Sequence, residues 1–287
     1  MHRSFAFLLA AGLASPLAAH AAESYDNCAG FIDALPATLT TQGVWCLRKD
    51  LNFAATLGDA IRINANNVTI DCNDFKIGGL SAGPGTTALG ITAVERHNAT
   101  VRNCSIRGFY RGVSLSGIEG GGHLVADNRL DGNTYNGIRV DGDGSMVRRN
   151  VVTATGGSTH IAKAIGISVN GSVDVLDNLV TGVHVDPAGA GAVTGIFAAG
   201  TPAGSVNGNR VLELAVGEVG SIEGIRVNGG HAIVRGNQLD GDSGAGTGTG
   251  TGLNCDDDST RAKDNSVIGF ATALLGCGNA GGNDLQP

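Results

Sequence analysis

The chain has 287 residues, of which 47 are glycine; 42% are hydrophobic and only 4% are aromatic. The hydrophobic fraction is large enough for a core of Val, Ile, Leu and Ala, which excludes a disordered low-complexity chain. The 19 basic and 26 acidic residues give a net charge of −7. This balance argues against a nucleic-acid partner bound by a basic surface and against a polybasic membrane anchor.

The first 22 residues have the pattern of a secretory signal peptide. Arg3 supplies a positive start, an apolar run extends from Phe5 to Leu17, and Ala19-His20-Ala21 matches a cleavage site with small flanking residues. The run is shorter than the ~20 apolar residues that span a bilayer, and no later segment is long enough. We therefore expect a secreted or periplasmic protein without a membrane span.

Six cysteines are present, and none forms a CxxC pair, which disfavours a zinc site. An even number of cysteines in an exported chain suggests disulfides, although six cysteines allow fifteen pairings. One or two buried free thiols are the alternative. The repeat described next favours the pairs Cys28–Cys46, Cys72–Cys104 and Cys255–Cys277.

A short pattern recurs eight times: an apolar residue, two variable residues, usually Asn, one variable residue and a second apolar residue. Its central positions are Asn73, Cys104, Asn128, Asn150, Asn178, Asn209, Asn237 and Asn265. A second pattern interleaves with it, a small residue followed by alternating aliphatic residues, as in Gly137-Ile138 and Gly166-Ile167. The alternation predicts short strands with one buried face, arranged in about nine coils.

Each copy is too short to bury its own apolar face, so the copies must stack, and stacking in register produces parallel sheets. Crossovers between parallel strands are right-handed in nearly all proteins. The sequence therefore predicts an all-β fold, a single right-handed parallel β-helix. We expect each central Asn to form a left-handed bend and to hydrogen-bond from coil to coil. A leucine-rich repeat is the alternative, but half of each copy is Gly-rich and β-like.

On these V-x-x-N-x-V and G-I-x-V repeats, residues 43–285 resemble the right-handed parallel β-helix superfamily, often called pectate-lyase-like. The resemblance implies three strands and three turns per coil, with the Asn bend between the second and third strands. It also implies that Gly-Ile lies in the first strand and that substrate binds along the outer face of the first sheet. The resemblance is specific for the fold and not for an activity.

We expect three segments: a signal peptide at 1–22, an N-terminal cap at 23–59 and the β-helix at 60–287. The cap contains the Cys28–Cys46 pair, and Phe31 to Leu35 are predicted to form a short helix over the first coil. Long segments just before the first strand are either walls of a cleft or neutral surface loops. They are 76–88, 153–164, 181–194, 211–223 and 239–251.

Polar residues alternate with the inward aliphatic residues of the predicted first strand. Arg139 and Arg226 are candidates for neutralising a uronate carboxylate or moving the neighbouring proton, and Asp141 and Asp256 are the candidate catalytic carboxylates. Further candidates for binding a polysaccharide, on the same strands or in adjacent loops, are His160, Ser168, Asn170, His184, Asp186, Asn228 and Asn254.

Calcium is the cofactor that the sequence suggests, with Asp240, Asp242 and Asp257 as candidate oxygen ligands; a solvated acidic turn is the alternative. The ordered motifs of polygalacturonase-like hydrolases and the Asp-Pro-His-Glu motif of mannuronan epimerases are absent. No catalytic residue is therefore transferred from a known enzyme.

Three functions remain open. The first is an enzyme, lyase-like or hydrolase-like, that acts on an acidic polysaccharide, and a walled groove with clustered Arg, Asp and His would favour it. The second is a non-catalytic binding or adhesion module with a flat polar sheet. The third is a structural rod, which a long exposed apolar stripe would favour. The oligomeric state is not predicted.

Overall fold

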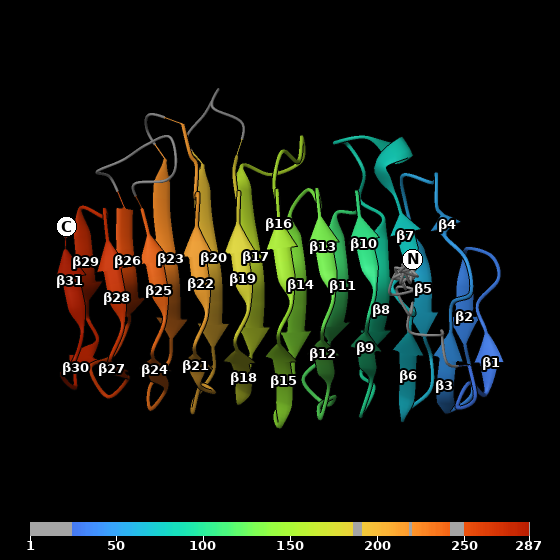
Figure 1. The fold of residues 1–287 in the computed structure, drawn as a ribbon, viewed down its shortest axis with the longest axis horizontal. Coiled ribbons are helices and arrows are strands. Elements are labelled where there is room, and N and C mark those ends of the chain that lie inside the picture. The colour runs from blue at the N-terminus through green and yellow to red at the C-terminus, as the bar shows by residue number, and fades with distance from the viewer. Residues whose placement is uncertain (1–24, 186–190, 218–219, 242–249, 287) are drawn as a thin grey trace, which may run out of the picture.

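The computed structural model describes residues 25–185, 191–217, 220–241 and 250–286. The predicted signal peptide lies outside them. The described chain winds as a right-handed parallel β-helix, as predicted, with three sheets along its length (Figure 1). One short 3₁₀ turn, η1 (Leu80–Ala82), interrupts the strands. No helix in the described part of the chain is long and apolar enough to cross a membrane.

The three sheets are called A, B and C. Sheet A contains β1 (Gly30–Phe31), β3 (Gly43–Cys46), β6 (Val68–Asp71), β9 (Thr100–Arg102), β12 (Leu124–Ala126), β15 (Ser145–Arg148), β18 (Val173–Leu176), β21 (Val206–Asn207), β24 (Ile233–Arg235), β27 (Arg261–Lys263) and β30 (Gly278–Asn279). Sheet B contains β2 (Ala37–Leu39), β5 (Asp59–Ile63), β8 (Leu89–Val94), β11 (Arg111–Ser116), β14 (Asn136–Asp141), β17 (Lys163–Asn170), β20 (Ala192–Ala199), β23 (Ser221–Asn228), β26 (Gly250–Cys255) and β29 (Thr272–Leu275). Sheet C contains β4 (Leu51–Asn52), β7 (Lys76–Gly78), β10 (Ser105–Arg107), β13 (Arg129–Asp131), β16 (Val151–Thr153), β19 (Leu179–Thr181), β22 (Arg210–Leu212), β25 (Gln238–Asp240), β28 (Ser266–Ile268) and β31 (Asp284–Gln286).

The chain visits the sheets in the order B, A, C, so three consecutive strands form one coil. Nine coils run from β5–β7 to β29–β31, as the repeats predict, and β2–β4 add a further coil within residues 37–52. Sheet B is thus the predicted first sheet, and the Asn bend joins sheet A to sheet C. Sheet C faces the reader in Figure 1.

Equivalent aliphatic residues stack on one another inside the coils. In sheet B, Val113, Ile138 and Ile167 are in register and fully buried. Burying each such side chain contributes about 1.5–3 kcal/mol. Because each coil supplies the same few inward positions, the stack forms one continuous core along the helix axis.

The central Asn residues form the predicted ladder. Asn128 Nδ2 donates to Asn150 Oδ1 at 2.9 Å, and Asn150 Nδ2 donates to Asn178 Oδ1 at 3.0 Å. The same contact continues through Asn209, Asn237, Asn265 and Asn283. Each oxygen also accepts the backbone N–H of the preceding ladder residue, which satisfies buried polar groups at every bend.

The prediction that the central Asn itself is left-handed is wrong for most coils. The left-handed residue lies one position earlier, as at Asp127 (φ 60°), Arg149 (φ 51°) and Asp177 (φ 55°). Among the central positions, all of which the structure describes, Asn73 alone has positive φ. The bend is displaced because the ladder amide must point inward to reach both neighbouring coils.

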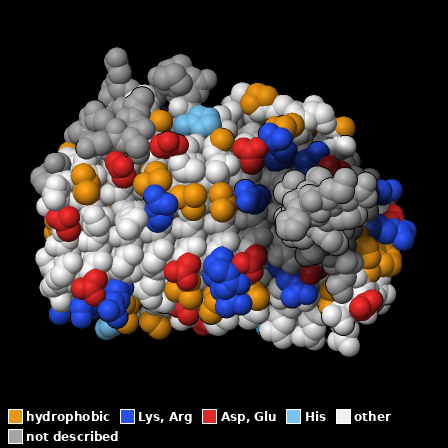
Figure 2. All heavy atoms as spheres, in the orientation of Figure 1, with side chains coloured by type: hydrophobic (Ala, Val, Ile, Leu, Met, Phe, Trp, Pro, Cys, Tyr) orange, Lys and Arg blue, Asp and Glu red, His pale blue; other side chains and the backbone are white. Residues whose placement is uncertain are grey.

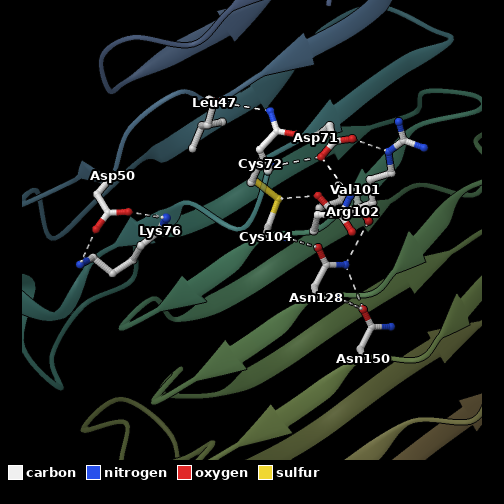
Figure 3. The surroundings of a disulfide bond; sticks show 12 residues. Leu47, Asp50, Asp71, Cys72, Lys76, Val101, Arg102, Cys104, Asn128 and Asn150 are labelled. Atoms are coloured by element: carbon white, nitrogen blue, oxygen red, sulfur yellow. Dashed lines mark hydrogen bonds and ion pairs between the residues drawn. A yellow bond between two sulfur atoms is a disulfide. The ribbon is translucent and has the colours of Figure 1, made fainter. Parts of the chain in front are cut away.

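The first repeat copy is longer than predicted. Asp71 is in register with Arg102 and Ile77 with Ile106, so the copy contains two extra residues between its paired strands. Ile77, and not Phe75, occupies the inward position. The extra length lies beside the Cys72–Cys104 disulfide, which joins two neighbouring coils where the Asn ladder begins (Figure 3).

All three predicted disulfides are present: Cys28–Cys46, Cys72–Cys104 and Cys255–Cys277. Three disulfides are typical of an extracellular or periplasmic environment. The helix predicted at Phe31 to Leu35 is wrong, because Gly30–Phe31 forms strand β1 and pairs with β3. The unpaired edge of sheet A supplies hydrogen bonds that override the local preference for a helix.

Candidate functional site

The outer face of sheet B, called the sheet B face below, carries a row of outward side chains in register. Each of these side chains lies between two inward apolar residues of its strand. They are Arg139, Ser168, Phe197, Arg226 and Asn254, on β14, β17, β20, β23 and β26 respectively. Neighbouring strands are about 4.8 Å apart. The row therefore presents one side chain per coil to solvent, at a regular spacing.

Arg139 and Asp141 form an ion pair within β14. Arg139 Nη2 donates to Asp141 Oδ2 at 2.9 Å, and the Asp141 side chain is only 8% exposed against 37% for Arg139. The predicted carboxylate is therefore already neutralised by the predicted cation. Ser168 and Asn170 are the register partners of these two residues on β17.

Arg226 bridges two carboxylates farther along the same face. Its Nη1 donates to Glu223 Oε1 at 2.7 Å and its Nη2 donates to Asp256 Oδ1 at 3.0 Å. The hydrogen bond to Glu223 raises the pKa of Arg226. Asn254 Nδ2 also donates to Glu223 Oε1, at 2.7 Å. Both carboxylates thus share one guanidinium, and neither is a free carboxylate.

A third cation on the sheet B face has aromatic partners instead. The guanidinium carbon of Arg111 lies 5.6 Å from the ring centre of Tyr110 and 5.4 Å from that of Tyr135. The two rings are 4.9 Å apart on neighbouring coils. Burial raises the pKa of the Tyr110 hydroxyl. Among the described residues, no carboxylate lies within ion-pair distance of Arg111 or of Lys163 at the start of β17.

Longer turns project where sheet C passes to sheet B, at one edge of the sheet B face (Figure 1). The turn after β7 and the turn after β16 meet over the two short turns between them. His160 Nε2 lies 2.8 Å from the carbonyl oxygen of Gly85, and Thr159 N donates to Pro84 O at 3.3 Å. The joined turns form a wall at this edge, so these two long segments are not independent surface loops.

A cavity of about 340 Å³ lies under this wall. Leu80, Pro84, Ala154 and His184 line it together with glycines and Thr134. The imidazole Nδ1 of His184 lies 3.1 Å from the carbonyl oxygen of Gly182. His160 and His184 are therefore at the wall and not on the strands of the sheet B face.

The opposite edge, where sheet B passes to sheet A, holds a buried imidazole. His123 is 2% exposed, and its Nδ1 accepts the backbone N–H of Ala99 at 3.2 Å. Burial lowers the pKa of His123 to about 4; His97 lowers it further, whereas Asp141 acts in the opposite direction. The ring is therefore neutral at pH 7, with its proton on Nε2.

The candidate calcium ligands do not gather. Asp240 ends β25 in sheet C, whereas Asp257 follows β26 at the far end of sheet B, about 20 Å along the strand direction. Asp257 Oδ1 accepts the N–H of Ser259, which lowers the pKa of Asp257. Asp242 and Asp186 lie outside the described residues. In the described segments no three acidic, His or Cys side chains are grouped as metal ligands.

The structure brings together many predicted residues and adds several. Ser168, Asn170, Asn228 and Asn254 lie on the sheet B face with Arg139, Asp141, Arg226 and Asp256. The prediction omitted Tyr110, Arg111 and Tyr135. Tyr110 and Tyr135 each stand two residues before the glycine of a Gly-aliphatic pair, so their stacking was accessible from the repeat register.

The sheet C face is different in character. Figure 2 shows isolated charges of both signs scattered over it among apolar and uncharged side chains. Its outward row includes Arg129, Val151, Leu179 and Arg210, and of these only the two arginines are charged. The aromatic–cation cluster and the bridged ion pairs belong to the sheet B face.

Among solved structures, the chain is similar to the A-module of the mannuronan C-5 epimerase AlgE6 from Azotobacter vinelandii. The two share 14% identity over 90% of this chain and 80% of that one, with a TM-score of 0.40. This similarity concerns the fold. No protein-family model and no curated protein matches the chain.

Proposed function

We propose that the chain is an exported protein that binds an acidic polysaccharide along the sheet B face. The observation that carries the proposal is the positive charge on the sheet B face that remains after the arginine–carboxylate pairs are accounted for. Glu223 and Asp256 are held by Arg226, and Asp141 is held by Arg139. Arg111 and Lys163 keep their positive charge without a carboxylate partner among the described residues.

The shape of the face suits an extended chain. From β11 to β26 it covers six coils, or about 24 Å at the usual strand spacing. Phe197 offers a ring for the apolar side of a sugar, while Ser168 and Asn254 offer hydroxyl and amide groups. Arg111 offers planar donors that match a carboxylate.

The ion pairs on the sheet B face favour a protein that binds the polysaccharide without cleaving or modifying it. A lyase needs a free base beside the sugar, and a hydrolase needs two working carboxylates. The carboxylates Asp141, Glu223 and Asp256 all accept hydrogen bonds from arginine. Cleavage or modification of the polysaccharide, with or without Ca²⁺, is the second candidate, because Tyr110 and Arg111 lie together on the same face.

The test measures binding of the mature chain to a polyuronate and to a neutral polysaccharide by titration calorimetry. We expect binding to the polyuronate alone, weakening as salt is raised. Arg111→Gln should weaken it about tenfold, as loss of a charge-assisted contact does. Arg210→Gln is the matched control, since Arg210 is an exposed arginine of sheet C without an ion pair among the described residues.

Two outcomes would contradict the proposal: no binding to any polyuronate, or equal weakening by both variants. Ultraviolet absorbance of the same mixtures, with and without Ca²⁺, reports unsaturated product. A rise in absorbance would establish a lyase that acts on the bound polysaccharide. A rise in reducing ends with no rise in absorbance would establish a hydrolase.

A further inference from the structure

A second pocket, separate from the row of arginines, opens at the edge where sheet B passes to sheet A. Its volume is about 460 Å³, and the turns of four successive coils line it. The turn after β11 is long and glycine-rich, and it bulges outward at Ile118, which is 90% exposed. The side chains in the lining that can hydrogen-bond are His97, Asn98, Asp143 and Asn170.

Glycine makes up much of the remaining lining: Gly117, Gly120, Gly121, Gly122, Gly142 and Gly171. The N–H groups of Gly121, Gly122, Gly142 and Gly171 are used in hydrogen bonds to backbone carbonyls. Without Cβ atoms, the backbone carbonyl oxygens of these turns can be approached by a small polar molecule, and each carbonyl has two lone pairs. At Gly121 an added Cβ would lie 2.7 Å from the carbonyl oxygen of Asp143, so glycine is required for this close packing.

The charges of the pocket select against an anion. Asp143 contributes a carboxylate, and the lining contains no Lys or Arg. Asp143 Oδ1 accepts the N–H of Ser172 at 2.8 Å, whereas its Oδ2 makes no hydrogen bond to a described residue. The Asn170 amide, on the last residue of β17, likewise has no partner among the described residues and lies at the pocket wall.

The buried His123 lies directly behind this wall. Its Nε2 is buried without a hydrogen-bond partner, and an added Cβ on Gly120 of the lining would lie 3.5 Å from it. With Nδ1 occupied by the Ala99 N–H, the Nε2–H is an unpaired buried donor behind the glycine turn, and His123 itself is not part of the pocket lining.

We propose that this pocket binds a neutral sugar residue. Hydroxyl groups both donate and accept, so they match the Asp143 carboxylate, the Asn170 amide and the glycine carbonyl oxygens together. Ile118 at the rim provides an apolar contact for the C–H face of the ring. A uronate does not fit, because its carboxylate would meet Asp143 with no cation to offset the repulsion.

The test titrates neutral trisaccharides (maltotriose, cellotriose and mannotriose) and a uronate trisaccharide into the full chain, read by saturation-transfer NMR and calorimetry. At least one neutral sugar should bind saturably. Asn170→Ala and Ile118→Ala should each weaken it about tenfold, which corresponds to loss of one good contact. Asn64→Ala is the control, an exposed Asn after β5 that is outside the pocket.

The pocket lining includes Asn170 at the end of the sheet B face, but it does not include Arg111. Arg111→Gln should weaken polyuronate binding and leave the affinity for the neutral sugar unchanged. The two proposals can therefore fail separately. The pocket proposal is overturned if no neutral trisaccharide saturates, if both pocket variants bind as the parent does, or if Ca²⁺ titration perturbs the pocket residues and sugars do not.

Discussion

Arg139 donates to the carboxylate of Asp141 two residues along the same strand, and the carboxylate is far more buried than the guanidinium. Removal of the two partners should therefore have unequal effects. Arg139→Gln leaves a nearly buried charge unpaired and should lower the free energy of unfolding by about 1–3 kcal/mol. Asp141→Asn leaves a cation that water reaches and should cost less.

The double variant Arg139→Gln/Asp141→Asn tests this directly. It should be more stable than Arg139→Gln alone, because the buried charge is gone. Urea unfolding of the parent, the two single variants and the double variant gives the coupling energy between the two residues. Additive effects of the two substitutions would mean that the pair does not interact in solution.

The Asn ladder should dominate the stability of the middle coils. Asn178 Oδ1 accepts the N–H and the side-chain amide of Asn150, and its Nδ2 donates to Val147 O. Asn178→Ala leaves these buried groups unpaired and should cost about 2–4 kcal/mol in urea unfolding. Asn64→Ala, at an exposed position, should change stability by about 0.5 kcal/mol or less. Similar losses for both would refute the ladder's role.

His123 should make the protein less stable in mild acid. Its pKa is about 4 in the folded chain against 6.5 in the unfolded chain, so below pH 6.5 the unfolded state binds a proton that the native state does not. Stability should fall by about 2 kcal/mol between pH 7 and pH 5 and level off below pH 4. His123→Gln should remove most of this slope; an unchanged slope would show that His123 is not its source.

The Cys255–Cys277 disulfide closes one short coil at the C-terminal end, with a sequence separation of 22. Loop-closure entropy predicts a contribution of about 3 kcal/mol. The double variant Cys255→Ala/Cys277→Ala should therefore have a lower urea midpoint of unfolding than the parent. After selective reduction of this disulfide, the parent should unfold at the same urea concentration as the double variant. A loss below about 1 kcal/mol would mean that the last coils are held by packing alone.

Repetition made the fold predictable. The recurrence of Asn and Gly-Ile at similar spacing predicts the coils and the edge with the long turns, and it favours the disulfide pairs that the structure contains. One error recurs along the repeat: in most coils the left-handed residue lies one position before the central Asn. The other two lie where repetition ends: Phe31 is in β1, before the first coil, and Phe75 belongs to a copy with two inserted residues. A single copy offers no register to correct such a displacement.

The site was predictable as a face but not as a set of contacts. Alternation along the strands placed Arg139, Ser168 and Arg226 outward correctly. Which carboxylate each arginine holds depends on side-chain rotamers across neighbouring coils, which the repeat does not encode. The pocket beside Ile118 depends on the path of one irregular turn, and the sequence carries no pattern for it.

The most direct test of the account is hydroxyl-radical footprinting of the mature chain with and without a saturating polyuronate. Oxidation should fall at Tyr110, Tyr135 and Phe197 on the sheet B face. It should remain unchanged at Phe31 in β1 and at Met146 in β15, both in sheet A. Protection of Phe31 or Met146 with none at the three sheet B residues would contradict the claim that the polysaccharide lies along sheet B.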